Sequence, residues 1–161
     1  MGIKTSSILI VDRKDAAHTF LASCLPDYYE CVPARSAVEA IEMLKQRPFD
    51  LVITDITMLN PSGIALCMFI HRTYPDTILV AVSGIGGVQY EIEAMRQGAF
   101  EYIEEPFDSA EVCASVEHAL RHRALFSSLS SLVEPTREAH PLMEGAYEAD
   151  SLDGAPSFLR M

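Results

Sequence analysis

Residues 50–55 read Asp-Leu-Val-Ile-Thr-Asp, an apolar and β-branched run that ends in a carboxylate. Two further runs have the same character, Ile-Leu-Ile-Val at residues 8–11 and Thr-Ile-Leu-Val-Ala-Val at residues 77–82. A run that is apolar on both faces is typical of a strand in a parallel sheet that helices cover on each side. Weaker runs at residues 29–34 and 99–103 bring the number of expected strands to five.

Segments with helical periodicity separate and follow these runs. Apolar residues recur at helix spacing, and Ser36 precedes the second such segment as an expected N-cap. Strand and helix therefore alternate five times, which predicts right-handed crossovers and an α/β fold with an open, doubly wound parallel sheet. The expected helices cover residues 16–24, 37–44, 64–70, 90–95 and 112–120.

The chain has 161 residues, enough for one domain with an appendage. We expect the domain to cover residues 7–123. An apolar stripe at helical spacing continues through residues 124–134, which predicts an extension of the last helix. This extension either packs back on the domain or serves self-association or partner docking. Residues 135–161 are acidic and rich in small residues, and we expect them to be disordered.

Charge and composition exclude several classes of protein. A formal net charge of −11 argues against direct nucleic-acid binding, because that binding draws most of its affinity from clustered Lys and Arg. The first seven residues are too short and polar for a signal peptide, and the composition does not suit a membrane protein, so we expect a cytoplasmic protein. The four cysteines lie far apart without zinc-ligand spacing, and we expect them to be reduced core residues.

Polar side chains end four of the expected strands. Asp12, Asp55, Ser83 and the segment Glu104-Glu105-Pro106 each follow an apolar run. Ligands of open α/β sheets bind outside the carboxyl ends of the strands. Any one of these residues could simply cap a loop, but the set of four predicts a site at this edge.

Further features keep a fixed order along the chain. They are Asp12 after Ile-Leu-Ile-Val, Asp55 with Gly63 eight residues later, Ser83 after Val-Ala-Val, Gly98-Ala99 before Tyr102, and Glu105-Pro106-Phe107. Together they resemble a response-regulator receiver domain of two-component signalling, similar to the chemotaxis receivers, over roughly residues 7–123. The resemblance implies a flavodoxin-like, five-stranded parallel sheet of order 2-1-3-4-5 with five helices.

The resemblance also implies a role for each matching residue. Asp55 matches the aspartate that attacks a phosphoryl group and forms an acyl phosphate. Family members hold Mg²⁺ with acidic residues, here Asp12 and Asp55, and with the backbone carbonyl at the place of Thr57. Ser83 matches the hydroxyl that hydrogen-bonds the phosphoryl group, and Tyr102 matches the aromatic switch residue. Self-phosphorylation and self-dephosphorylation on Asp55 are the most that is expected as enzyme activity.

Two residues depart from the family pattern. Arg13 stands where receivers place a second acidic residue after the first strand, and Glu105 stands where they place a lysine. The two exchanges leave the net charge of the pocket at −2, but the positive and the negative side chain have exchanged places. One hypothesis is that Arg13 pairs with Asp55 or Glu105 and weakens or prevents Mg²⁺ binding. The other is that Arg13 points to solvent and Glu105 lends the metal an oxygen.

Two functions follow from these observations. The first is a stand-alone phosphoacceptor, which takes a phosphoryl group from a histidine kinase or phosphotransfer protein and signals through the surface of its fourth and fifth helices. The second is a phosphorylation-impaired pseudo-receiver that serves as an interaction or dimerisation module. A homodimer is compatible with both. A nucleotide or flavin enzyme on this fold would need a phosphate-binding loop after the first strand, and residues 13–17 offer none.

Overall fold

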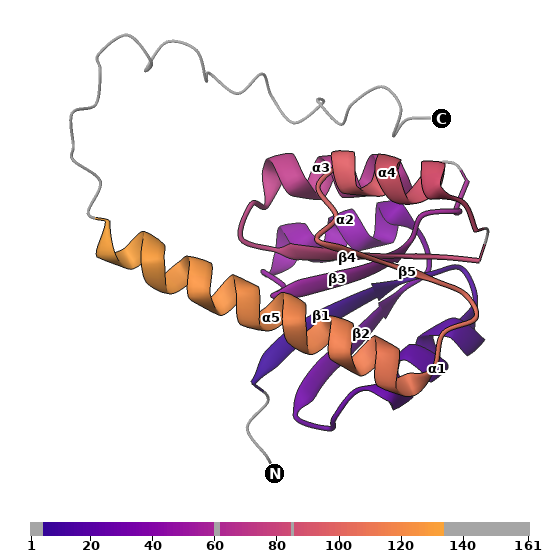
Figure 1. Ribbon diagram of the computed structural model, residues 1–161, viewed down its shortest axis with the longest axis horizontal. Coiled ribbons are helices and arrows are strands. Elements are labelled where there is room, and N and C mark those ends of the chain that lie inside the picture. Colours follow the sequence, from indigo (N-terminus) through magenta and orange to yellow (C-terminus); the bar gives the residue numbers. More distant parts are fainter. Residues whose placement is uncertain (1–4, 60–61, 85, 134–161) are drawn as a thin grey trace, which may run out of the picture.

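The computed structural model describes residues 5–59, 62–84 and 86–133. Five parallel strands form one sheet in the order β2-β1-β3-β4-β5, which confirms the predicted topology (Figure 1). The chain enters at β1, moves to one edge, returns past β1 and then builds the other edge. The strands are β1 Ser6–Val11, β2 Tyr29–Ala34, β3 Leu51–Asp55, β4 Ile78–Ser83 and β5 Glu101–Glu104.

Helices cover both faces of the sheet. The second, third and fourth helices lie on one face, and the first and fifth lie on the other (Figure 1). This arrangement follows from right-handed crossovers, which place helices on alternate faces when the strand order reverses. The helices are α1 Asp15–Cys24, α2 Ala37–Gln46, α3 Gly63–Thr73, α4 Val88–Arg96 and α5 Ser109–Leu132.

Alternate residues of the central strands supply the two halves of the core. Leu9 of β1 is the register partner of Val52 of β3, and both pack under α2 and α3. The next pair, Ile10 and Ile53, faces α1 and α5 instead. All four side chains are fully buried. Burying an aliphatic side chain of this size contributes roughly 1.5–3 kcal/mol, so the central strands are rigid supports for the loops at their ends.

The fifth strand begins two residues later than the sequence pattern predicts. Gly98 takes a φ of 100°, and the Ala99 N–H donates to the Ala94 carbonyl, so both residues complete the turn that ends α4. A Cβ at Gly98 would lie 2.3 Å from the His71 ring, which makes this close approach of α3 possible only for glycine. Pairing with β4 starts only at Phe100, whose N–H donates to the Leu79 carbonyl.

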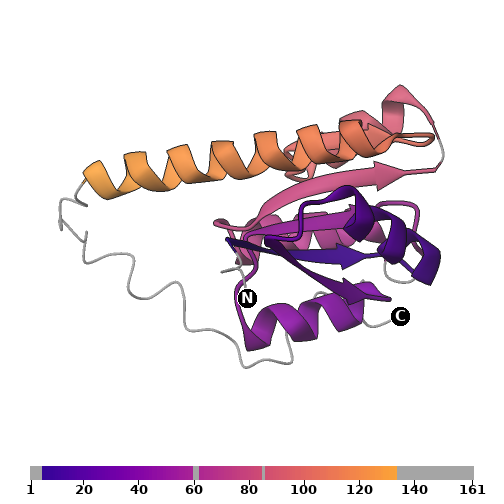
Figure 2. The ribbon, with the colours of Figure 1, turned by 90° about the horizontal axis from the view of Figure 1, so that it is seen from below.

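The fifth helix runs past the end of the sheet (Figure 2). Arg123 anchors it where it leaves the domain: the guanidinium donates to the Asp76 carbonyl at 2.7 Å and pairs with the Asp50 carboxylate at 2.9 Å. The residues predicted to extend the last helix are helical as far as Leu132. Residues 134–161, with the predicted tail, lie outside the described residues. Among the helices that are described, none is both long and apolar enough to cross a membrane.

Candidate functional site at the carboxyl edge of the sheet

Asp55 is the last residue of β3 and is half-buried at the carboxyl edge of the sheet. Its Oδ1 accepts two hydrogen bonds from Thr57, one from the backbone N–H at 2.8 Å and one from the hydroxyl at 2.6 Å. Within the described part of the chain, no hydrogen bond reaches Oδ2. The carboxylate is therefore held by one oxygen and presents the other.

Gly63 explains why a glycine follows Asp55 at a spacing of eight residues. A Cβ at this position would lie 2.0 Å from the Asp55 carbonyl oxygen and 2.5 Å from Cα of Ile56. Both are backbone atoms, which cannot move aside as a flexible side chain could. Ser62 caps α3 by accepting from the Ala65 N–H, so the loop returns tightly against the end of β3. The glycine thus lets α3 begin directly against the segment that carries Asp55.

Asp12 directly follows β1 and is 6% exposed. Its Oδ1 accepts from the Lys14 N–H at 2.8 Å. Burial raises the pKa of the Asp12 carboxyl above its ordinary value of 3.8, the Lys14 N–H opposes this, and the negative charge of Asp55 raises the pKa further. The Asp12 and Asp55 carboxylates are therefore close enough to repel each other. This agrees with their positions at the ends of the adjacent strands β1 and β3.

Ser83 and Tyr102 lie on the two strands beyond β3. Ser83 is buried at the end of β4, which pairs directly with β3. Tyr102, on β5, packs its ring against the core under α2 and α3. Its hydroxyl is buried and has no hydrogen-bond partner among the described residues. An unpaired buried hydroxyl is costly, so this inward orientation of Tyr102 carries a local penalty.

The two departures from the family pattern lie apart from each other. Arg13 is exposed and forms no ion pair with any residue in the described ranges, so the structure lacks the expected pair with Asp55 or Glu105. The reason is local: the Asp12 carboxylate binds the Lys14 N–H and turns the chain into α1, which leaves Arg13 on the outside of the turn. Glu105 lies over the next loop, because a Cβ at Gly84 would meet its Oε2 at 2.9 Å.

The donor set at this edge suits a hard divalent cation. Asp12 and Asp55 offer carboxylate oxygens, and their mutual repulsion is what a cation between them would relieve. Mg²⁺ is commonly held by one or two carboxylates with several waters, so the set fits it. The described residues contain no group of three His, Cys, Asp or Glu side chains that could hold a metal, and Glu105 therefore adds no third carboxylate to the pair.

A cleft of about 470 Å³ opens beside this pair. Asp12 and Glu105 supply its polar side, and the walls are apolar. Phe20 of α1 and Phe107 after β5 face each other there, with ring centroids 5.9 Å apart. The acidic edge is thus reached through an apolar opening between α1 and the β5–α5 loop.

Sequence reasoning missed the side chain of Thr57. It assigned this residue only a backbone role, whereas the hydroxyl fixes one oxygen of Asp55. An aspartate side chain commonly forms a turn by accepting a hydrogen bond from the residue two positions later. A hydroxyl residue at that position, as Thr57 is after Asp55, could have indicated the contact.

Comparison with known proteins decides the family. The family model of the response regulator receiver domain matches residues 8–117. The chain belongs to this family. Receiver domains act in two-component signalling, where they interact with histidine kinases and downstream effector domains, and they typically use Mg²⁺. The resemblance recognised from the strand-end residues is confirmed, and with it a signalling domain rather than a member of a conventional enzyme family.

Similar proteins include regulators that are much longer than this chain. The response regulator PilR of Pseudomonas aeruginosa is 34% identical over 56% of this chain and 20% of its own length. The nitrogen assimilation regulator NtrX of Azorhizobium caulinodans is 31% identical over 80% of this chain and 30% of its own. The crystal structure of Brucella abortus NtrX with ADP has a TM-score of 0.73 at 30% identity, covering 82% of this chain and 29% of that one. The receiver therefore spans less than a third of these regulators.

Proposed function

We propose that this receiver accepts a phosphoryl group on Asp55 and thereby changes how it binds a partner. The observation that supports this most is the asymmetry of the Asp55 carboxylate, in which Thr57 holds Oδ1 and leaves Oδ2 without a hydrogen bond from the described residues. A nucleophile fixed in orientation, half-buried and with one oxygen available is what in-line phosphoryl transfer requires.

The reaction is a displacement at phosphorus. Oδ2 of Asp55 attacks the phosphoryl group of a phosphohistidine, the P–N bond breaks, and an acyl phosphate remains on the aspartate. Asp12, Asp55 and the Thr57 carbonyl are the residues that would hold Mg²⁺, which would offset the charge repulsion between carboxylate and phosphoryl group. Ser83, buried at the end of the neighbouring strand, is the hydroxyl proposed to donate to a phosphoryl oxygen.

We further propose that the altered positions lower the metal affinity and the rate without abolishing them. Arg13 is exposed and leaves the Asp12–Asp55 pair accessible, so it does not take the place of the cation. However, it removes one carboxylate, and Glu105 puts a negative charge at the cleft where receivers have a lysine. An incoming dianion meets repulsion there rather than attraction.

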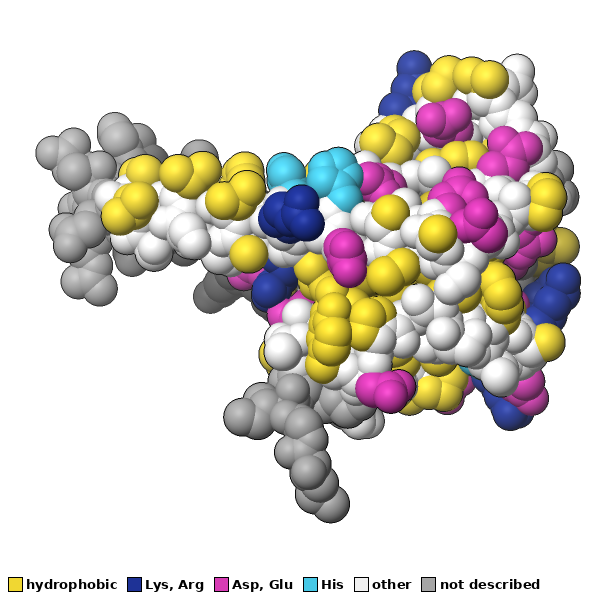
Figure 3. All heavy atoms as spheres, turned by 60° about the horizontal axis from the view of Figure 1, so that its bottom comes forward, with side chains coloured by type: hydrophobic (Ala, Val, Ile, Leu, Met, Phe, Trp, Pro, Cys, Tyr) yellow, Lys and Arg dark blue, Asp and Glu magenta, His cyan; other side chains and the backbone are white. Residues whose placement is uncertain are grey.

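The phosphodonor is proposed to approach through the cleft between α1 and the β5–α5 loop, where Phe20 and Phe107 provide an apolar rim around the acidic pair. The output surface is proposed on α4 and α5. Large apolar or aromatic side chains of α4 are exposed, namely Val88 at 69%, Tyr90 at 40%, Ile92 at 48% and Met95 at 45%. Apolar side chains also run along the projecting part of α5 (Figure 3).

One observation favours the second function, a pseudo-receiver held in a single conformation. Tyr102 already points inward, with its hydroxyl buried. If that orientation is independent of phosphorylation, the α4–β5–α5 surface is constant and the domain acts as an interaction module.

Labelling by a small phosphodonor tests both functions. Incubation with acetyl phosphate and Mg²⁺ is expected to add one phosphoryl group, detected as a mass increase that Asp55→Asn abolishes. The double variant Arg13→Asp with Glu105→Lys is expected to label faster and at lower Mg²⁺ concentration. No labelling of the native chain even at saturating Mg²⁺, with labelling restored in the double variant, would favour the pseudo-receiver.

A further inference from the structure

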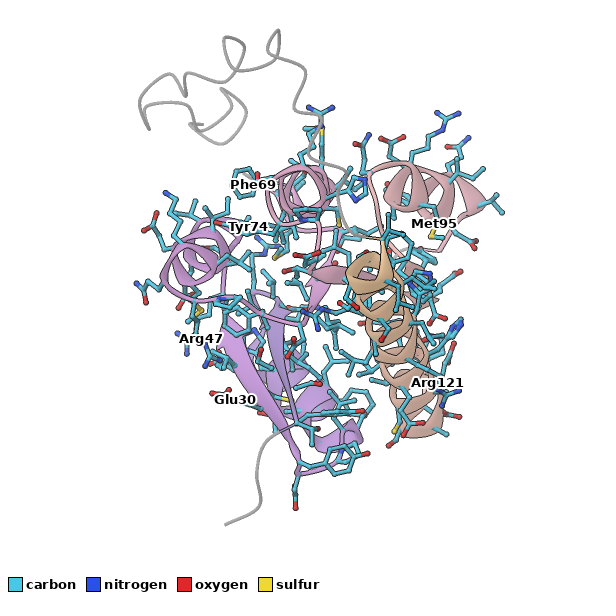
Figure 4. The ribbon with its side chains drawn as sticks, turned by 90° about the vertical axis from the view of Figure 1, so that its left-hand side faces the viewer. Glu30, Arg47, Phe69, Tyr74, Met95 and Arg121 are labelled. Carbon is cyan, nitrogen blue, oxygen red and sulfur yellow. The ribbon has the colours of Figure 1, made fainter. Side chains whose placement is uncertain are left out.

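A second hollow lies at the opposite edge of the sheet from Asp55. It has a volume of about 750 Å³ and exists because α5 continues past the amino ends of β4 and β5. Figure 4 views the molecule from this end, with Met95 of α4 standing above α5. Its lining includes His71, Met95, Arg96, His122, Phe126 and Ser127.

The walls of this hollow are apolar and aromatic. Phe126 is 65% exposed on α5, and Met95 faces the same space from α4. Phe100, His122 and Phe126 form a ladder of rings with centroid separations of 4.5 and 5.9 Å. Large apolar side chains on both sides of an open hollow indicate a surface suited to apolar anchor residues.

Two arginines and one aspartate are the charged residues that line the hollow at neutral pH. Arg96 lines it and has no ion-pair partner within the described ranges. His71 and His122 lie beside it, while Arg123 is already paired with Asp50. Asp76 is the acidic residue of the lining. An unpaired arginine in an open hollow contrasts with the net charge of −11 of the chain, and it favours a ligand that carries carboxylates.

The chain itself carries a segment with both acidic and apolar side chains. Residues 134–161 contain six acidic residues and two arginines, with apolar residues such as Leu142, Met143 and Tyr147 between them. The segment begins immediately after Val133, close to the residues of α5 that line the hollow. Val133 lies seven positions after Phe126, about 10 Å along the helix, and a few extended residues cover that distance on the way back.

We propose that the acidic segment of residues 138–153 binds in this hollow of its own chain. Its apolar side chains pack between Met95 and Phe126, and its carboxylates face Arg96 and the two histidines. The bound segment joins the end of α4 to α5.

Photo-crosslinking in the full chain tests this proposal. Ser127 lines the hollow, whereas the adjacent Ser128 does not and donates to the Ala124 carbonyl. With p-benzoyl-phenylalanine at Ser127, irradiation is expected to link α5 to a peptide from residues 138–153 within one chain. The same group at Ser128 is equally near the tail along the sequence and is the matched control. Equal linkage from both positions would overturn the proposal.

Charge reversal provides the second arm. Arg96→Glu is expected to lower the Ser127 crosslink by about tenfold, because a like charge is placed against the acidic segment. Arg121→Glu makes the same charge change on α5 outside the lining, and is expected to have little effect (Figure 4). Adding Glu144→Lys and Glu148→Lys to Arg96→Glu is expected to restore the crosslink. Linkage between two chains, rising with protein concentration, would identify a second copy as the occupant and contradict binding in cis.

Discussion

At the residue scale, the site depends on how neighbouring backbone atoms restrict a few side chains. Thr57 binds one oxygen of Asp55, and Gly63 allows the chain to return against the carbonyl of the same aspartate. Lys14 donates to Asp12 and turns Arg13 outward. The orientation of each functional group is therefore set by contacts within two to eight residues, on strands that the core holds rigid.

Gly63→Ala is expected to destabilise the fold by about 2 kcal/mol, because the added Cβ overlaps backbone atoms and the loop must shift. Labelling of Asp55 by acetyl phosphate is expected to fall with it. Urea unfolding and the labelling rate measure the two effects. Gly84→Ala is the matched control, since the atom that its Cβ meets belongs to the exposed end of Glu105. A native-like midpoint for Gly63→Ala would show that the close approach is not needed.

Tyr102→Phe is expected to stabilise the fold by about 1 kcal/mol, because it removes a buried hydroxyl that has no partner among the described residues. The same substitution at the exposed Tyr90 serves as a control, with little change expected. Urea unfolding without a phosphodonor measures both. If Tyr102→Phe instead lowers stability, the hydroxyl has a partner in the unphosphorylated protein.

Asp12→Asn is expected to change how stability depends on pH. The pKa of Asp12 is raised in the folded chain by burial and by Asp55, so the native carboxyl costs stability as pH rises from 3.8 through the folded pKa. Asparagine keeps an oxygen for the Lys14 N–H and carries no charge. The variant should therefore gain stability relative to the native chain across that window and keep the gain at neutral pH.

Mg²⁺ separates this prediction from a general effect of the substitution. The cation is expected to stabilise the native chain and to leave Asp12→Asn unchanged, since the variant lacks one of the two carboxylates. Thermal unfolding with and without Mg²⁺ measures this. An equal rise in both proteins would mean that Asp12 does not contribute to the metal site.

At the element scale, the fifth helix stands out within this molecule, because it continues beyond the sheet. Arg123 holds it at the point where it leaves, through Asp50 before β3 and the Asp76 carbonyl before β4. The helix thus joins the two central strands at the edge opposite Asp55. The angle at which α5 leaves the domain depends on this one side chain more than on apolar packing, since the residues after it are exposed.

Arg123→Met is expected to lower the free energy of unfolding by about 1–2 kcal/mol, less than a buried ion pair would give because both partners are partly exposed. Hydrogen exchange is expected to quicken for the amides of residues 124–132 and to stay native-like for Val112–Ala119, which remain packed. Arg121→Met is the matched control on the same helix. Uniformly faster exchange along all of α5 would indicate that the helix is anchored elsewhere.

The sequence predicts the elements well and the contacts of side chains poorly. Strands that are apolar on both faces, such as residues 8–11 and 51–54, have no other favourable environment than a covered parallel sheet, so their order followed once the family was recognised. The start of β5 was wrong by two residues, because the turn at Gly98 depends on His71 from another helix.

In the candidate site too, the sequence predicts the positions of residues better than the contacts of their side chains. The positions of Asp12, Asp55 and Ser83 at strand ends are fixed by periodicity, and they meet because parallel strands end at one edge. The orientation of Arg13 could not be deduced, since it depends on the turn that the Lys14 N–H makes with Asp12. Charge counting alone therefore suggested an ion pair that the turn prevents.

At the scale of the whole molecule, the chain carries a net charge of −11, and Arg96, which forms no ion pair within the described ranges, lines one hollow. The net charge of −11 opposes compactness through self-repulsion, whereas the proposed contact between residues 138–153 and Arg96 depends on attraction. Salt screens both. The two effects therefore respond to ionic strength with opposite signs, which distinguishes them in one titration.

Raising NaCl from about 0.02 M to about 0.5 M shortens the screening length severalfold, and is expected to raise the free energy of unfolding by on the order of 1 kcal/mol. The exposed ion pairs, such as Arg35 with Asp15, lose little because such pairs contribute little at any salt concentration. Over the same range the crosslink from Ser127 to the tail is expected to fall. Sucrose at matched osmolality stabilises the fold without screening charge and should leave the crosslink unchanged. If salt strengthens the crosslink instead, the tail is held by its apolar residues and Arg96 is not its partner.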